Sequence, residues 1–230
     1  LGVRVSNLED RVGNVKLTGD ARVRFRDQKS TVAADNLKND KSWDFRGRLR
    51  ANAKINDRAD AVIGVSYSTS FANQTAASAD GDKLFVDRAY VNYALDNGHK
   101  WNVMVGRYDY ELGNATGIQY GDNFDGAQLK FANKKMAATA GYGKFKEGAL
   151  NDTKTAYGEL EGFFGGGSVA GSAVGAFYNN FNKGTGTAAP DDLWGAYTSL
   201  NFAKKFNFLG EYQKVNNPGT STDADVFYGK

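Results

Sequence analysis

Apolar or small residues alternate with polar residues along residues 43–55, which read WDFRGRLRANAKI. Trp43, Leu49 and Ile55 fall in the apolar set, whereas Arg46 and Arg48 fall in the polar set. Successive side chains of a strand point to opposite faces, so the pattern predicts a strand with one apolar and one polar face. A tilted membrane strand needs about 9–11 residues, while strands of soluble proteins usually have about 5–6. The length therefore favours a membrane, although alternation alone leaves open whether the apolar face meets lipid or a packed interior.

The same period of two recurs along the chain and predicts twelve strands. They cover residues 15–25, 43–55, 59–71, 85–95, 101–105 onward, 124–131, 136–145, 157–164, 169–178, 194–202, 206–215 and the stretch from about 224. The connections between them alternate between short and long. Short turns at one end and long loops at the other are typical of outer-membrane barrels. We therefore expect an all-β fold, a transmembrane antiparallel up-and-down β-barrel, over residues 15–230.

Aromatic residues lie near the ends of the predicted strands, on the apolar face. Bands of aromatic residues at both membrane interfaces are a second mark of outer-membrane barrels. Glycine and alanine fill much of the rest of this face, which suits contact with fluid lipid better than a core that must be filled. The residues expected to form a lipid-facing aromatic girdle are Trp43, Phe85, Trp101, Trp194 and Phe202.

The first fourteen residues follow a different period. Leu1, Val5, Leu8, Val12 and Val15 are spaced by four, three, four and three positions, which is a heptad seam. Residues 1–14 are therefore expected to be helical. Two interpretations stay open: one amphipathic helix that packs on its own domain, or the end of a coiled-coil stalk that begins upstream.

Composition removes several classes of function. The 230 residues suffice for one large β domain. The chain has no cysteine, which excludes disulfides, thiolate metal sites and cysteine nucleophiles. No stretch approaches the roughly 18 consecutive apolar residues of a membrane-spanning helix. The formal net charge of +3 is small, so the distribution of the charges matters more than their sum.

Arginines concentrate on the polar face of the first, second and fourth predicted strands. Because alternate residues of a strand share a face, they are expected to form a basic wall that lines a water-filled pore. The alternative is the solvated, charged face of an ordinary sheet. Nucleic-acid binding is not favoured, because aromatic residues are not interleaved on the same face. The residues of this predicted wall are Arg22, Arg24, Arg46, Arg48, Arg50 and Arg88.

Enzyme chemistry finds little support in the sequence. The single histidine, His99, follows Gly98 in a short turn, where an exposed bystander is the simplest interpretation. No nucleophile has an evident partner base, and no His or Cys cluster has the spacing of a metal site. Glu159 and Glu161 share a strand face and are expected to line water. We therefore predict no catalytic residue, no metal and no cofactor.

Three segments resemble a known family. They are LEDRVGNVKLTGDARVRF (residues 8–25), FVDRAYVNY (85–93) and VGRYDYELG (105–113). The chain resembles the barrel of Gram-negative general porins, and more narrowly the porins of diderm Firmicutes (Veillonella and Selenomonas relatives) with an S-layer-homology domain and a coiled-coil stalk. The family barrel has about sixteen strands. With twelve strands and no terminal aromatic residue, we expect either that part of the barrel lies outside this chain or that the barrel is smaller.

The resemblance also implies a constriction. Porins fold the long loop after the fifth strand into the pore, and residues 108–123 occupy that position. Its acidic residues Asp109, Glu111 and Asp122 are expected to face the arginine wall, and the resulting transverse field would orient polar solutes.

The expected function is passive diffusion of small hydrophilic solutes and ions through the bacterial outer membrane. The expected partners are outer-membrane lipid, two further copies in a homotrimer and, only through an N-terminal domain absent from these residues, peptidoglycan. Two alternatives stay open: a tether that links the outer membrane to the cell wall, and a soluble ligand-binding β-barrel.

Overall fold

A computed structural model describes nine segments of the chain: residues 14–28, 40–70, 83–114, 123–146, 150–165, 171–182, 190–202, 205–216 and 224–230. Except for Asn14, the predicted coiled-coil end at residues 1–14 lies outside these segments. Asp122 of the predicted constriction loop lies outside them as well.

Twelve strands make up nearly all of the described chain. In sequence order they are β1 (Val15–Gln28), β2 (Asp40–Lys54), β3 (Ala59–Ser70), β4 (Lys83–Ala94), β5 (Trp101–Asp109), β6 (Asn123–Ala132), β7 (Met136–Phe145), β8 (Lys154–Phe164), β9 (Ser172–Asn182), β10 (Asp192–Phe202), β11 (Phe206–Asn216) and β12 (Ala224–Gly229). Each strand is hydrogen-bonded to the strands that precede and follow it in the chain. The prediction of an all-β, antiparallel, up-and-down fold is confirmed.

The strand boundaries follow the period-two pattern closely in most places. β7 has the predicted bounds, and β3 and β10 differ from theirs by a residue or two. β9 differs more, because it runs Ser172–Asn182 instead of the predicted 169–178. Its pairing with β8 extends from Phe164 opposite Ser172 to Lys154 opposite Asn182, so both strands reach further toward the 183–189 connection than the pattern predicts.

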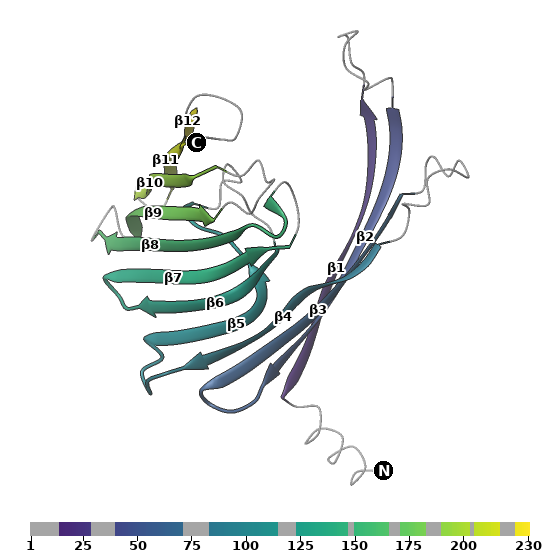
Figure 1. The fold of residues 1–230 in the computed structure, drawn as a ribbon, viewed down its shortest axis with the longest axis horizontal. Helices are drawn as coiled ribbons and strands as arrows, with labels where there is room; N and C mark the ends of the chain where they lie inside the picture. The colour runs from purple at the N-terminus through teal and green to yellow at the C-terminus, as the bar shows by residue number, and fades with distance from the viewer. Residues whose placement is uncertain are drawn as a thin grey trace. The chain divides into compact units, whose positions relative to one another are not determined.

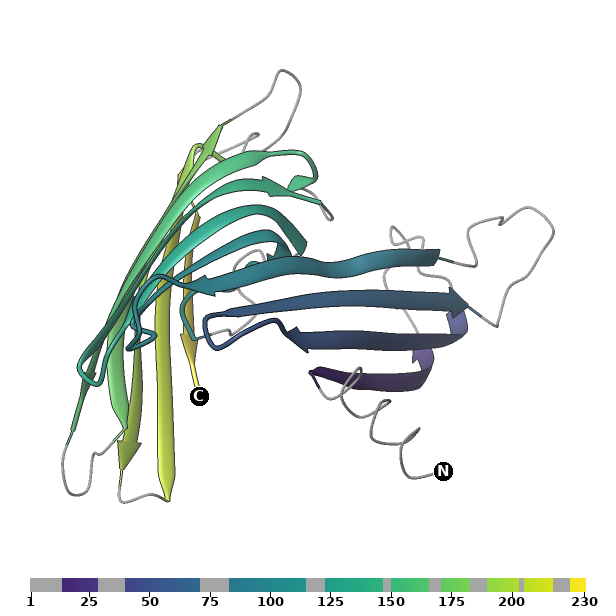
Figure 2. The same ribbon diagram turned by 90° about the horizontal axis from the view of Figure 1, so that it is seen from below.

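The strands fall into two compact units. The first comprises residues 1–55 and 60–89, with β1, β2, β3 and the start of β4; the second comprises residues 56–59 and 90–230, with the remaining strands. Figure 1 and Figure 2 show β5 to β12 side by side in chain order, in a sheet that curves. No helix in the described segments has the length and apolar character needed to cross a membrane.

The first unit has one apolar face and one charged face, as the alternation predicts. Leu17, Leu49 and Ile63 project from β1, β2 and β3 and are 65%, 53% and 62% exposed. The register places Gly19 opposite Leu49 and Leu49 opposite Val65, so these apolar positions share one face. Large apolar side chains are thus displayed on an open surface instead of being packed in a core.

The second unit displays a similar apolar face. Leu129 of β6, Leu160 of β8, Tyr178 of β9 and Phe208 of β11 are all exposed, Leu160 to 62%. Monomeric soluble proteins rarely expose contiguous apolar surface on this scale, which instead marks contact with lipid or with another protein. We call this side the apolar face and the opposite side, on which residues 110–114 lie, the loop face.

The alternation slips in β4. Leu84 and Val86 are exposed at one parity, whereas Val91 and Tyr93 are exposed at the other. Two adjacent residues between them are both buried, a pattern typical of a β-bulge, in which one extra residue switches the faces. Phe85 is half-buried, and its side chain lies on the opposite face from those of its exposed neighbours. The structure therefore does not support its predicted place in a lipid-facing girdle.

Short turns join the strands at one end, and side chains fix two of them. Between β4 and β5, Asp96 accepts hydrogen bonds from the backbone amides of Trp101 at 2.8 Å and Gly98 at 3.1 Å. These amides, that of Trp101 foremost, hold the pKa of Asp96 below its usual value of 3.8. Between β6 and β7, Asn133 accepts from the amides of Lys135 and Met136.

Candidate functional site

Aromatic side chains form a buried cluster on the loop face of the second unit. Phe124 and Phe145 are fully buried, and Tyr108 and Tyr157 share a hydrogen bond of 2.9 Å between their hydroxyls. The Tyr110 ring lies in the middle, with its centroid 4.9 Å from those of both Phe145 and Tyr157 in edge-on geometry. Such contacts add to the energy of apolar burial. The segment that follows β5 is therefore packed firmly onto this face.

Residues 110–114 then run across the loop face toward β11. The Tyr110 hydroxyl donates to the Asn179 side chain of β9, and burial raises the pKa of this phenol well above its usual value. Further along, the Gly113 amide donates to Glu159 of β8 at 2.8 Å. The Asn114 side chain ends the described run with bonds to backbone carbonyls of β10 and β11. The hydrogen bonds of this segment thus reach β8, β9, β10 and β11.

Gly113 is the position where this crossing depends on glycine. Its φ is +67°, in the left-handed region, and a Cβ there would lie 3.0 Å from Phe177 and 3.1 Å from Glu211. Glu211 is itself buried and accepts from the Asn114 amide at 3.2 Å. Charge-assisted hydrogen bonds to a buried carboxylate are stronger than neutral ones. Glu159 and Glu211 therefore hold the backbone of the loop against the loop face of the sheet. We call these two hydrogen bonds the latch.

Side chains of residues 108–112 alternate between buried and exposed positions. Tyr108, Tyr110 and Leu112 are each at most 3% exposed and pack on the wall, whereas Asp109 and Glu111 are exposed. The described part of the predicted constriction loop, residues 108–114, thus lies against the loop face of the sheet, and its narrowing of a pore stays a prediction. Glu111 is exposed on this segment, whereas Asp109 is the last residue of β5 and has the parity of Val105, which places it on the apolar face.

Glu159 and Glu161 do not simply line water, as the sequence led us to expect. The Tyr197 hydroxyl lies within hydrogen-bond distance of both carboxylates, 2.8 Å from Glu159 and 2.7 Å from Glu161. Tyr197 is buried, and its ring covers Gly175, where any Cβ would meet it at 2.3 Å. Of these groups, Glu159 also accepts the hydrogen bond from the Gly113 amide and so contacts the loop directly. The strand parity of the two glutamates placed them on the right face, but nothing local in the sequence indicated what covers them.

The predicted arginine wall lies on one face of the first unit and is interleaved with aspartates. On β1, the Arg24 side chain donates to Asp44 at 2.8 Å, and Arg22 lies 3.5 Å from the same carboxylate. These side chains are roughly a third exposed, so each ion pair contributes little to stability by itself. The wall carries five arginines in ion pairs within the described strands, Arg22, Arg24, Arg46, Arg48 and Arg50.

Two further carboxylates complete this wall. Arg48 donates to Asp20 at 2.7 Å, and Arg46 lies 3.5 Å from the other oxygen of Asp20. Arg50 donates to Asp87 at 2.8 Å. The interpretation as a purely basic ladder needs correction: the wall is an alternating network with an excess of cations. Asp20 and Asp44 share the arginines' parity in the sequence, so the signal was present in the pattern.

Gly64 of β3 leaves room for the side chains of Arg50 and Asp87, because it has no Cβ. It pairs with Arg50, and an added Cβ would lie 2.9 Å from Arg50 Cγ and 2.4 Å from Asp87 Oδ1. Arg88 lies beside it, buried, and donates to the carbonyl of Asp87 at 2.6 Å. The charged side chains of β2 and β4 thus lie flat over a strand that has no side chain at this point.

The wall and the loop belong to different units, so their predicted opposition across a pore stays a prediction. The same holds for the contribution of Asp122. Within the described residues, no three His, Cys, Asp or Glu side chains gather as metal ligands would.

The predicted girdle residues other than Phe85 are exposed on the apolar faces. Trp43 packs on Phe25 with ring centroids 5.0 Å apart, and Trp101 packs on Phe131 at 4.8 Å. Cross-strand aromatic pairs of this kind stabilise neighbouring strands. Trp194 and Phe202, which lie near opposite ends of β10, are exposed as well.

Arg107 lies on the apolar face, as its parity with Val105 predicts. Its guanidinium donates to both oxygens of Asp125, at 2.6 and 2.9 Å. The two residues stand directly opposite each other in the pairing of β5 with β6. Arg107 therefore belongs to the outer surface of the sheet and not to the arginine wall.

Comparison with known proteins finds similarity to solved structures but not to any family model or curated protein. Among solved structures, the chain is similar to the crystal structure of OccAB4 from Acinetobacter baumannii, with a TM-score of 0.46 and 16% sequence identity. The match covers 87% of this chain and 66% of that one, so the chain spans just under two thirds of OccAB4 as crystallised. The described strands themselves define the class: an all-β protein whose twelve described strands form an antiparallel up-and-down sheet.

Proposed function

We propose that this protein is an outer-membrane porin, a passive channel for small hydrophilic solutes and ions. The observation that carries the proposal is the docked segment 110–114, which lies across the loop face while large apolar side chains cover the opposite face. A segment held over a polar wall is the arrangement by which a loop narrows a water-filled pore. An exposed apolar face is what a strand presents to lipid.

Pore selectivity follows from the charges on the two units. The exposed carboxylate of Glu111 stands on the loop, and the wall of β1 to β4 carries more arginines than aspartates. Opposite charges across a narrow pore create a transverse field that favours polar solutes. On this proposal the protein needs no catalytic group and no cofactor.

The decisive experiment is conductance in planar bilayers together with liposome swelling in sugars of increasing size. We expect stable channels with a sharp upper limit on sugar size. Replacing residues 111–122 with a short Gly-Ser linker should raise both conductance and the size limit. The matched control shortens the connection at residues 29–39, which should leave both unchanged. Absence of conductance would overturn the channel proposal, and a protein that stays monodisperse without detergent would support the soluble barrel instead.

We further propose that the protein belongs with the stalk-bearing porins of diderm Firmicutes and assembles as a homotrimer. The support is the resemblance of residues 8–25 to the junction of stalk and barrel, together with the heptad seam at residues 1–15. Mass measurement in a mild detergent should give three copies. A monomer would refute the trimer, and a membrane-inserted trimer without conductance would favour the tether.

A further inference from the structure

A row of charged residues crosses the apolar face near one end of β5 to β8. The register aligns Arg107 with Asp125, Asp125 with Lys144 and Lys144 with Lys154, each on a neighbouring strand. The parity of Lys144 matches that of the exposed Tyr142, and the residue next to Lys154, Thr155, is fully buried on the other face. We call these four residues the charged row. It stands among otherwise apolar side chains.

The charged row has more cations than its carboxylates can neutralise. Lys144 donates to Asp152 at 3.0 Å, and Lys146 lies 3.7 Å from the same oxygen. Lys144 and Lys154 also stand directly opposite each other on adjacent strands. Like charges in that position are destabilising unless an anion lies between them. Together with Lys146, Asp152 and Asp109 on the same face, the row has four cations and three carboxylates and therefore carries a net positive charge.

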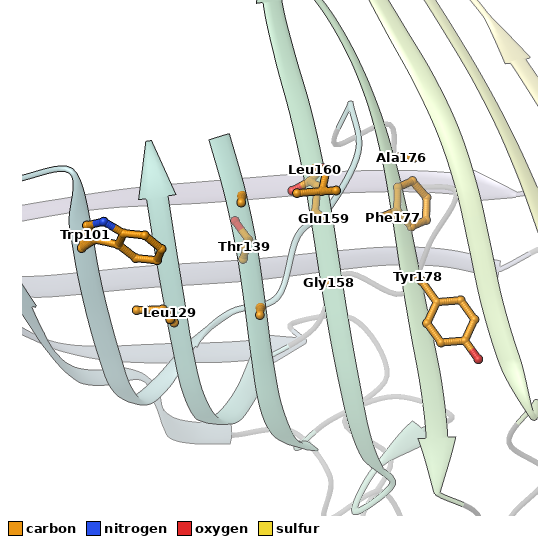
Figure 3. A pocket seen from close by; sticks show the side chains of 11 residues that line it. Trp101, Leu129, Thr139, Gly158, Glu159, Leu160, Ala176, Phe177 and Tyr178 are labelled. Carbon is orange, nitrogen blue, oxygen red and sulfur yellow. The ribbon is translucent and has the colours of Figure 1, made fainter. Parts of the chain in front are cut away.

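A groove lies further along the same strands on the same face. It has a volume of about 510 Å³ and is framed by Trp101, Leu129, Leu160 and Tyr178. Figure 3 shows these four side chains on β5, β6, β8 and β9. Small residues, Ala138, Ala140, Gly158 and Ala176, form its floor, so the hollow is lined almost wholly by carbon.

The spacing of these two features fits one molecule. Lys144 follows Ala140 by four residues along β7, and Lys154 precedes Gly158 by four along β8. At roughly 3.3 Å per residue the charged row lies about 13 Å from the groove. The row is at the strand ends that lead into the 110–122 and 146–153 connections, the level at which lipid headgroups meet a barrel. A charged headgroup and the upper part of an acyl chain span such a distance.

We propose that this face binds an anionic phospholipid, with its phosphate on Arg107, Lys144 and Lys154 and one acyl chain in the groove. Guanidinium and ammonium groups are the side chains that recognise phosphate, and cations near a membrane surface strengthen binding to anionic lipid. The inference rests on the proposed membrane barrel but does not require that the barrel conduct.

The test is lipid retention in native mass spectrometry of the full chain refolded in detergent. The probes are dioleoyl phosphatidylglycerol and, as the net-neutral match, dioleoyl phosphatidylcholine. We expect the wild-type protein to retain one phosphatidylglycerol at least tenfold more readily. The double variant Lys144→Gln/Lys154→Gln should reduce this preference to about twofold or less. The control Lys134→Gln/Lys135→Gln removes the same charge from the turn at the other end of the strands and should leave the preference intact.

Two further readouts keep the outcomes distinct. Ala140→Leu should fill the groove and lower retention of both lipids while the charged row is unchanged. Equal retention of the two lipids by the wild type, or an equal loss of preference in both double variants, overturns the lipid site. Bilayer conductance of the same samples is scored separately. Conductance without lipid preference would support the channel proposal and refute the lipid site. Selective lipid retention without conductance would support the lipid site and refute the channel.

Discussion

Replacing Gly113 with alanine should release residues 110–114 from the loop face of the second unit. Gly113 has a φ of +67°, and its amide donates to Glu159 at 2.8 Å. A residue with a Cβ resists that backbone conformation, so the variant must either bear the strain or leave the site. We therefore expect an undocked loop, higher mean conductance and more current noise.

The size of the effect can be worked from the contacts. The left-handed conformation costs a non-glycine residue about 1–2 kcal/mol. The new Cβ would also lie 3.0 Å from Phe177, whose side chain is only 3% exposed and cannot readily move. A change of 1–2 kcal/mol shifts a two-state ratio by a factor of about 5–30. The ratio of docked to undocked loop should fall by at least that factor, since the steric contact adds to the backbone cost.

Single-channel recordings provide the assay, and Gly171→Ala provides the control. Gly171 has a φ of +82° in the turn before β9, so alanine there carries a similar backbone cost. Its Cβ would meet only the Asn201 side chain, at 3.4 Å, and it lies outside the loop. Conductance should change in Gly113→Ala alone. If both variants conduct like the wild type, or if both change alike, the latch at Gly113 does not narrow the pore.

Three other changes test the remaining parts of the structure. Leu49→Arg should cost about 2–4 kcal/mol in urea unfolding from lipid vesicles if Leu49 lies near mid-bilayer, whereas Arg48→Leu on the opposite face should be mild; equal costs would contradict the assignment of faces. Replacing Arg46 and Arg48 together with glutamine should shift the reversal potential under a salt gradient toward cations, and Glu111→Gln should shift it toward anions; unchanged preference in both would remove these residues from the pore. The depressed pKa of Asp96 means that its ionised carboxylate stabilises the fold above about pH 4. This contribution is lost as the pH falls through the folded-state pKa. The free energy of unfolding should therefore fall less in Asp96→Asn than in the wild type between pH 7 and pH 3.

Period-two alternation predicted the strands because it reports a local property. Residues such as Leu49 and Arg48 need only the direction of one strand to be assigned to opposite faces, and the structure assigns them as the pattern does. The slip in β4 escaped the prediction because a bulge changes parity without changing composition. Asp87 and Arg88 are adjacent in sequence, yet both are buried, and Phe85 is displaced as a result.

The docking of the loop could not be predicted residue by residue, because it depends on contacts between distant strands. Asn114 reaches the carbonyls of Thr198 and Gly210, which lie far along the chain. The resemblance to porins placed a loop at this position, but it named only the acidic residues as important. Glu159 and Glu211 instead accept hydrogen bonds from the backbone amides of Gly113 and Asn114, and only the structure shows these bonds.

One feature of β9 could have indicated where the loop docks. Tyr178 is exposed on the apolar face, while Phe177 and Phe181 at the other parity are buried. A strand that lines an open pore needs large apolar side chains on one face only, because water covers the other. Aromatic residues on both faces mean that something besides water covers the pore side. The same is true of β8, where Tyr157 shares a face with the glutamates. In a chain of alternating strands, a change from one-sided to two-sided aromatic character therefore marks the stretch of wall that a loop must cover.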